Sequence, residues 1–105
     1  MKDKRNLTVM ADIIFFSSSR GGRHSMPEGD GYSPYFRSDS MSENLAVRIL
    51  GVPRDSMADS VFRVGIELVY HPSFHYGELK VGEHFCLLEG TKTIAEGVLV
   101  SFGHE

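Results

Sequence analysis

The clearest indication of the fold lies in the segment Phe62-Arg63-Val64-Gly65-Ile66-Glu67-Leu68-Val69-Tyr70. Large apolar side chains occupy every second position, so they would share one face of an extended chain: Phe62, Val64, Ile66, Leu68 and Tyr70. Polar or small residues take most of the positions between them. A period of two is typical of a β-strand that buries one face. We therefore predict a half-buried strand over 62–70.

The same alternation recurs on both sides of this stretch. It appears in segments 8–15, 45–49, 85–87 and 94–102; in the last, Ile94, Val98, Val100 and Phe102 are expected to share a face. Turn-forming glycines separate the segments. A helical apolar stripe is missing, and 55–59 is expected to form one helical turn at most. Short strands with tight turns at this density favour an all-β sandwich or barrel.

Residues 17–42 differ from the rest of the chain. They are rich in serine, glycine and charge, yet they hold three aromatic residues close together, Tyr32, Tyr35 and Phe36. A long irregular segment inside a compact domain is often functional, although a flexible surface loop is the simpler interpretation. We expect residues 1–6 to form a tail and 7–103 a single β-barrel domain with a long loop at 17–42.

Composition limits the classes of function. The 105 residues fit one domain, and 11 basic against 14 acidic side chains give a net charge of −3. The charge divides into +2 over residues 1–37 (6 basic, 4 acidic) and −5 over 38–105 (5 basic, 10 acidic). A generic polyanion binder is therefore disfavoured, and any anion-binding surface would draw on the first third. Without an apolar run of signal-peptide or membrane-spanning length, we expect a cytoplasmic protein that does not contact membranes.

Signals for catalysis or metal binding are weak. Gly90-Thr91-Lys92-Thr93 resembles the end of a phosphate-binding loop but lacks its spacing, so a hairpin turn is expected there. The histidines His71, His75 and His84 have no helical context that would aim them at one metal, and loop or edge-strand histidines are the better interpretation. Cys86 lies in an apolar strand, where a lone cysteine packs as a small hydrophobe. We predict no enzymatic activity, no cofactor and no metal.

Recognition residues gather in the loop instead. Arg20, Arg23, His24 and Arg37 surround the three aromatic residues. Guanidinium groups bind phosphates and aromatic rings stack on bases, which would suit RNA. Arginine and tyrosine are equally the preferred anchors of protein interfaces. A third interpretation is structural: Tyr32 and Phe36 cap one end of the barrel core while the arginines stay solvated.

The order of several motifs resembles the C-terminal (third) domain of elongation factor Tu. These motifs are Gly21-Gly22-Arg23-His24, Gly31-Tyr32-Ser33-Pro34-Tyr35-Phe36-Arg37, Leu68-Val69-Tyr70-His71-Pro72 and the hairpin segment Glu89-Gly90 to Gly97. The resemblance covers about residues 7–102. It implies a six-stranded antiparallel Greek-key β-barrel.

The resemblance also implies a binding face. In that family, the Gly-Gly-Arg-His turn and the following Gly-Tyr-x-Pro loop hold the T-stem backbone of aminoacyl-tRNA. The matching positions are Gly22, Arg23, His24, Gly31, Tyr32, Pro34 and Arg37. The chain departs from the family over 25–30, where two acidic residues enter. These residues hold no counterpart of the GTPase and middle domains, so we expect neither a GTP switch nor delivery of tRNA to the ribosome.

Together these features predict a noncatalytic binding module that acts through a protein partner. The partner would be a translation factor, a ligand of that factor or a toxin, and the module a mimic, decoy or immunity-type protein. The alternative is a tRNA- or RNA-binding module that uses the Gly21–Arg37 face. The candidate residues for either partner are Arg20, Gly22, Arg23, His24, Gly31, Tyr32, Pro34, Tyr35 and Arg37. The sequence is compatible with a monomer or a homodimer.

Overall fold

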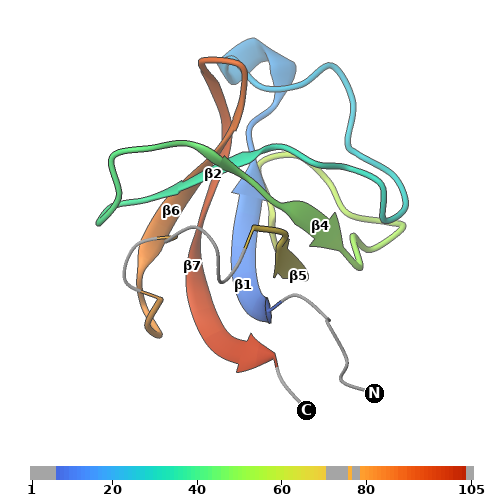
Figure 1. Ribbon diagram of the computed structural model, residues 1–105. Helices are drawn as coiled ribbons and strands as arrows, with labels where there is room; N and C mark the ends of the chain where they lie inside the picture. The colour runs from blue at the N-terminus through green and yellow to red at the C-terminus, as the bar shows by residue number, and fades with distance from the viewer. Residues whose placement is uncertain (1–6, 71–75, 77–78, 104–105) are drawn as a thin grey trace.

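The computed structural model describes residues 7–70, 76 and 79–103. It is an antiparallel β-barrel (Figure 1), one of the two all-β architectures, sandwich or barrel, that the alternation of apolar residues favours. Its elements are β1 (Leu7–Phe15), the short 3₁₀ turn η1 (Ser18–Arg20), β2 (Tyr35–Ser38), β3 (Leu45–Ala46), β4 (Arg48–Leu50), β5 (Val61–Leu68), β6 (His84–Glu89) and β7 (Lys92–Gly103).

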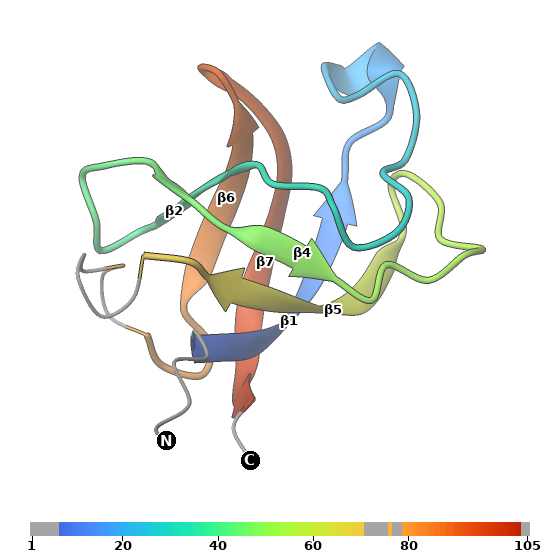
Figure 2. The ribbon, with the colours of Figure 1, turned by 45° about the vertical axis from the view of Figure 1, so that its right-hand side comes forward.

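One short segment closes the barrel. The strand order is β3-β2-β6-β7-β1-β5-β4, so β3 and β4 lie at opposite edges of the sheet. Only Val47 separates them in the chain, and its amide donates to the carbonyl of Pro34 at 3.0 Å. Segment 45–50 therefore joins the two edges (Figure 2). If segment 45–50 is counted as one strand, the barrel has the six strands expected. Because the segment is interrupted at Val47, the structure has seven.

The connections have Greek-key character. The hairpin of β6 and β7 joins neighbours, whereas β1 to β2 and β5 to β6 connect strands that are not adjacent in the sheet. Every pairing is antiparallel, as this topology requires. The connection from β1 to β2 carries most of the candidate binding residues.

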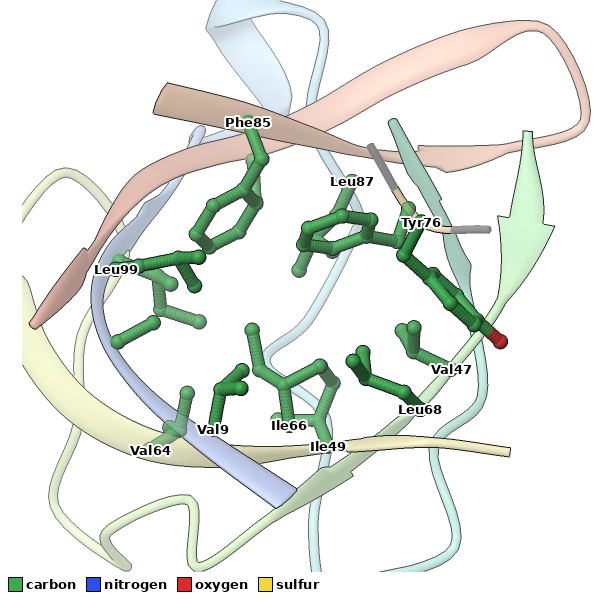
Figure 3. Close-up of a cluster of buried hydrophobic side chains, with 14 of the residues drawn as sticks. Val9, Val47, Ile49, Val64, Ile66, Leu68, Tyr76, Phe85, Leu87 and Leu99 are labelled. Carbon is green, nitrogen blue, oxygen red and sulfur yellow. The ribbon is translucent and has the colours of Figure 1, made fainter. Parts of the chain in front are cut away.

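Inward-facing side chains fill the barrel (Figure 3). The alternation predicted for the first strand is confirmed, since Val9, Ala11, Ile13 and Phe15 are all buried. They meet side chains from the other strands, among them Ile49, Ile66, Phe85, Leu87 and Leu99. Gly97 faces the same interior. A Cβ there would lie 2.9 Å from the Phe85 ring and 2.4 Å from the carbonyl oxygen of Asp12, so glycine makes room for that ring.

Three expectations about strands need correction. β5 ends at Leu68, and Tyr70 is exposed rather than in the core. In β7 the register shifts opposite Leu87/Leu88, so Ile94 faces inward but Val98 faces outward. One extra residue reverses the alternation beyond it. Finally, the segment expected to be an irregular loop contains strand β2; the turns within 55–59, by contrast, agree with the expectation of one helical turn at most.

Several expectations concern residues outside those described. They are the tail 1–6, the histidines His71 and His75, the Pro72 that follows the matching strand end, and the turn at Gly77.

Candidate functional site

The backbone geometry of the Gly21-Gly22 turn requires glycine at both positions. Gly21 has a φ of +89°, a left-handed conformation that ends η1. A Cβ on Gly22 would lie 1.8 Å from the carbonyl oxygen of Phe16, so only glycine fits there. The amide of Gly22 donates to the carbonyl of Ser17 at 2.8 Å. This tight turn directs the chain back over the end of the barrel and positions Arg23.

Arg23, Tyr32 and Glu89 form one contact group, which we call the Arg23 cluster. The Arg23 guanidinium forms an ion pair with the Glu89 carboxylate, and the Tyr32 hydroxyl donates to the same carboxylate oxygen at 2.5 Å. The guanidinium also lies 4.6 Å from the centre of the Tyr32 ring. Its Nε donates to the carbonyl of Ser25 at 2.9 Å. The cluster thus attaches the loop to the β6–β7 hairpin, which lies beside it in Figure 1.

The charges of the Arg23 cluster stabilise one another. Burial lowers the pKa of Arg23, but hydrogen bonds to Glu89 and Tyr32 outweigh that effect and raise it. Burial raises the pKa of Glu89, yet the bonds donated by Tyr32 and Arg23 bring it below its usual value. The pKa of the Tyr32 hydroxyl rises through burial and the neighbouring carboxylate. At neutral pH the cluster is therefore an ion pair with a neutral phenol.

An aromatic stack links this cluster to the core. The ring centre of Phe15 lies 5.9 Å from that of Phe62 and 6.0 Å from that of Tyr32. Tyr32 is half-buried and packs against the core cluster, while Phe36 lies fully inside it. The structural interpretation of these two aromatic residues, as part of the core and its cover, agrees with this packing.

Arg20 is also paired within the chain. Its guanidinium lies 3.0 Å from the Asp59 carboxylate and 5.4 Å from the centre of the Phe16 ring. Asp59 accepts a further bond from the Ser17 amide at 3.1 Å. Asp59 itself has a φ of +66°, which aspartate tolerates better than most residues. Ser17 first, and then Arg20, lower the pKa of its carboxyl.

The remaining candidate residues divide between two environments. Pro34 is buried, and His24 and Gly31 are exposed on the loop. Tyr35 and Arg37 project from the outer face of β2, whose alternate residues are buried. In register they lie opposite Leu88 and Cys86 of β6. Among the nine candidates, Arg23 and Tyr32 are therefore both bonded to Glu89, Arg20 is paired with Asp59, and Tyr35 and Arg37 form an outward-facing pair on β2.

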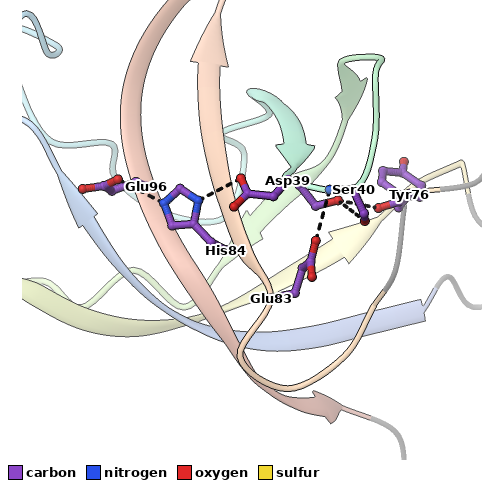
Figure 4. A network of polar contacts seen from close by, with 7 residues as sticks. Asp39, Ser40, Tyr76, Glu83, His84 and Glu96 are labelled. Carbon is purple, nitrogen blue, oxygen red and sulfur yellow. Dashed lines mark hydrogen bonds and ion pairs between the residues drawn. The ribbon is translucent and has the colours of Figure 1, made fainter.

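A second cluster was missed by sequence reasoning. His84 at the start of β6 has Nδ1 3.0 Å from an Asp39 carboxylate oxygen and Nε2 3.1 Å from a Glu96 carboxylate oxygen (Figure 4). We call these three residues the His84 cluster. The hydrogen bond to Asp39, and then that to Glu96, raise the pKa of His84. The expected edge strand is incorrect for this histidine, because β6 pairs on both sides.

A network beneath the His84 cluster holds the turn after β2. The Ser40 amide donates to the largely buried Glu83 carboxylate at 3.2 Å, and the Ser38 hydroxyl donates to the carbonyl of Tyr76 at 3.3 Å (Figure 4). The Asp39 amide donates to the carbonyl of His84 at 3.0 Å. Backbone and side chain thus both tie this turn to the start of β6.

The His84 cluster does not activate a thiol. Cys86 lies two residues along the same face of β6, but both His84 nitrogens already contact carboxylates. Burial, helped by Glu96 and Asp39, raises the pKa of the Cys86 thiol, the opposite of what a nucleophile needs. The carboxylates contact opposite nitrogens of the ring, so they do not surround a common point. Within the described residues, no three His, Cys, Asp or Glu side chains group to hold a metal ion.

Two hollows accompany these clusters. One of about 590 Å³ lies between loops 25–29 and 52–56. The other, about 400 Å³, lies on the outer face of the sheet, where Ile14, Val61 and Val98 accompany Asp12, His84 and Glu96. Val61 is 67% exposed, so the second hollow has an apolar rim open to solvent.

Comparison with known proteins finds neither a family model that matches this chain nor a matching curated protein. Within the ranges 7–70 and 79–103, no helix has the length and apolar character needed to span a bilayer.

Proposed function

We propose that this protein is a noncatalytic β-barrel that acts by binding another protein, in the manner of a mimic or decoy of the third domain of elongation factor Tu. Two observations support it: the order of the motifs in the sequence and the all-β barrel that the described residues form. The partner would be a translation factor, a ligand of that factor or a toxin.

The observation that carries the choice of a protein partner concerns the arginines. Arg23 is paired with Glu89 and Arg20 with Asp59, so two cations of the basic first third are neutralised by carboxylates of the acidic remainder. RNA binding depends on cations that are available to phosphates. With Arg20 and Arg23 already paired, fewer cations are available to phosphates, and the surface is better suited to a protein.

Tyr35 and Arg37 are the residues we assign to the interface. They lie two positions apart on β2, so their side chains leave the same face of the strand, and Tyr35 is 44% exposed. Tyrosine and arginine provide most of the binding free energy in many protein interfaces. Neither side chain contributes to the core, so both can be replaced without loss of the fold.

The test compares wild type with a Tyr35→Ala/Arg37→Ala variant. Tagged full-length protein is incubated with a lysate of its native cells, and captured proteins are quantified against the bait. We expect wild type to retain one protein near equal stoichiometry and the double variant to lose it. A Thr91→Ala/Lys92→Ala variant, which removes a similar charge from the exposed β6–β7 turn, is the matched control and should bind as wild type does.

The tRNA alternative is measured in parallel. Fluorescence anisotropy with total tRNA should reveal only weak, non-specific association, with a dissociation constant no tighter than roughly 1 µM at physiological salt. Tighter binding that weakens in Arg37→Ala, together with no stoichiometric protein, would reverse the proposal in favour of RNA.

A further inference from the structure

The geometry around His84 requires a particular protonation state. Each ring nitrogen lies within hydrogen-bond distance of a different carboxylate, 3.0 Å for Asp39 and 3.1 Å for Glu96. A neutral imidazole has a single N–H and can donate only one bond. The imidazolium form donates both, and each bond is then assisted by charge. The observed arrangement is therefore that of a protonated histidine.

The other charges near His84 also favour a cation. Asp12 on β1 lines the same hollow, but its carboxylate is occupied by Arg63 of β5 at 2.8 Å. Arg37 of β2 lies opposite Cys86, one alternate position along β6, and Glu83 precedes His84 in the chain. Among these residues, four carboxylates (Asp39, Glu96, Asp12 and Glu83) outnumber the two arginines, and Asp39 and Glu96 are the two that contact the ring.

The protonated ring connects three parts of the barrel. Asp39 begins the turn 39–44 between β2 and β3, His84 begins β6, and Glu96 lies within β7. If the ring loses its proton, one carboxylate faces a nitrogen lone pair. Asp39 is the carboxylate that can leave, because its side chain is 67% exposed and lies on a turn, whereas that of Glu96 is 47% exposed and lies on a paired strand.

We propose that protonation of His84 controls the attachment of the turn 39–44 to β6 and β7. The imidazolium holds the turn 39–44 against β6 and β7, and loss of its proton releases Asp39 and loosens this turn while the barrel stays folded. The contribution has a definite sign. Hydrogen bonds donated to Asp39 first, and then to Glu96, raise the folded-state pKa of His84, so the stabilisation is complete below the unfolded pKa of about 6.5. It is lost as pH rises through the folded pKa, above that value.

The experiment uses the full-length ¹⁵N-labelled protein. The imidazole signal of His84, assigned by its disappearance in His84→Gln, is titrated by NMR, and amide exchange is recorded at pH 6 and pH 9 as protection factors. We expect a titration midpoint above about 6.5. The protection factors of the Asp39, Ser40 and Met41 amides should fall about fivefold between the two pH values. Those of Gly21 and Gly22, which are bonded within the opposite loop, should not change.

Two variants distinguish release of the turn by His84 from a general loss of stability at high pH. His84→Gln keeps a neutral donor at every pH, so the fall in protection between pH 6 and pH 9 should vanish. Asp39→Asn should lower the His84 midpoint and leave the turn weakly protected at both pH values. Because Asp39 is exposed, this variant tests the proposal even if His84→Gln fails to fold. Asp59→Asn, at the other loop, should leave the midpoint unchanged.

Three results would overturn the proposal. The first is a His84 midpoint at or below about 6.5. The second is protection of the turn that stays constant across the midpoint. The third is an equal fall in protection in wild type and in a folded His84→Gln variant.

Discussion

The Arg23 cluster and the His84 cluster have the same structural role but use different cations. Each fastens a connecting segment to strands of the barrel through contacts between a cation and a carboxylate. In the first, two donors, Arg23 and Tyr32, share the carboxylate of Glu89. In the second, one ring donates to two carboxylates, Asp39 and Glu96. The guanidinium keeps its charge at any pH a protein tolerates, whereas imidazole loses its charge near neutrality.

The two clusters also differ in burial. The side chains of Arg23 and Glu89 are 27% and 37% exposed, whereas His84, Asp39 and Glu96 are 40%, 67% and 47% exposed. Water screens exposed pairs, so the same contacts stabilise less there. The loop at 17–37 is therefore attached to the barrel at every pH, whereas the turn at 39–44 is attached only while His84 is protonated. Four predictions test this contrast.

Gly22→Ala should have the largest effect, because it removes the support of the Arg23 cluster. The added Cβ would overlap the Phe16 carbonyl, so the turn before Arg23 cannot keep its path. We expect the free energy of unfolding to fall by about 3 kcal/mol or more. Urea denaturation measures it. Gly31→Ala is the control, since a Cβ there meets nothing within 4 Å, and an equal loss in both variants would contradict the prediction.

Glu89→Gln should come next. It leaves the half-buried Arg23 without its counter-ion and weakens the acceptor for Tyr32, at a cost of about 1–3 kcal/mol. The pKa of the Tyr32 hydroxyl should fall, because the Glu89 carboxylate contributes to raising it. Denaturation and an alkaline ultraviolet titration measure the two effects. Glu28→Gln, on the exposed part of the same loop, should change neither. Unchanged stability in Glu89→Gln would show that the ion pair contributes nothing.

A pair of double-mutant cycles at pH 6 and pH 9 contrasts the clusters directly. The coupling free energy between Arg23 and Glu89 should be the same at both pH values. The coupling between His84 and Glu96 should be about 0.5–1 kcal/mol at pH 6 and near zero at pH 9, because His84, whose pKa is raised, carries its charge at pH 6 and loses it as the pH rises. If both couplings change with pH, or neither does, the contrast between a permanent and a conditional fastening is wrong.

The smallest effect concerns Cys86. Its thiol pKa is raised first by burial and then by Glu96 and Asp39, so alkylation at mildly alkaline pH should be slow. Glu96→Gln removes one of the repelling charges and should speed alkylation about twofold at fixed pH. Asp59→Asn, distant from this face, serves as the reference. A reaction in wild type as fast as that of a free thiol would contradict the raised pKa.

Particular residues show how far sequence reasoning reached. The alternation of Val9, Ala11, Ile13 and Phe15 predicted β1, because every second side chain of an extended chain lies on the same face. β2 was missed since it is four residues long and includes Arg37 and Ser38. Ser38 is nevertheless buried, because its hydroxyl finds a partner in the Tyr76 carbonyl. The resemblance to the elongation factor domain stays a prediction.

Local sequence alone predicts that this chain forms short, half-buried strands of an all-β sandwich or barrel and that Gly21-Gly22 makes a tight turn. Those properties follow from neighbours along the chain, through the period of side-chain burial and the φ angles glycine allows. Tertiary structure alone decided what the charged side chains do. Arg23 and Glu89 are 66 residues apart, and His84 and Asp39 are 45 apart. Such pairs depend on strand register and loop path, which set the distances between side chains without leaving a local pattern.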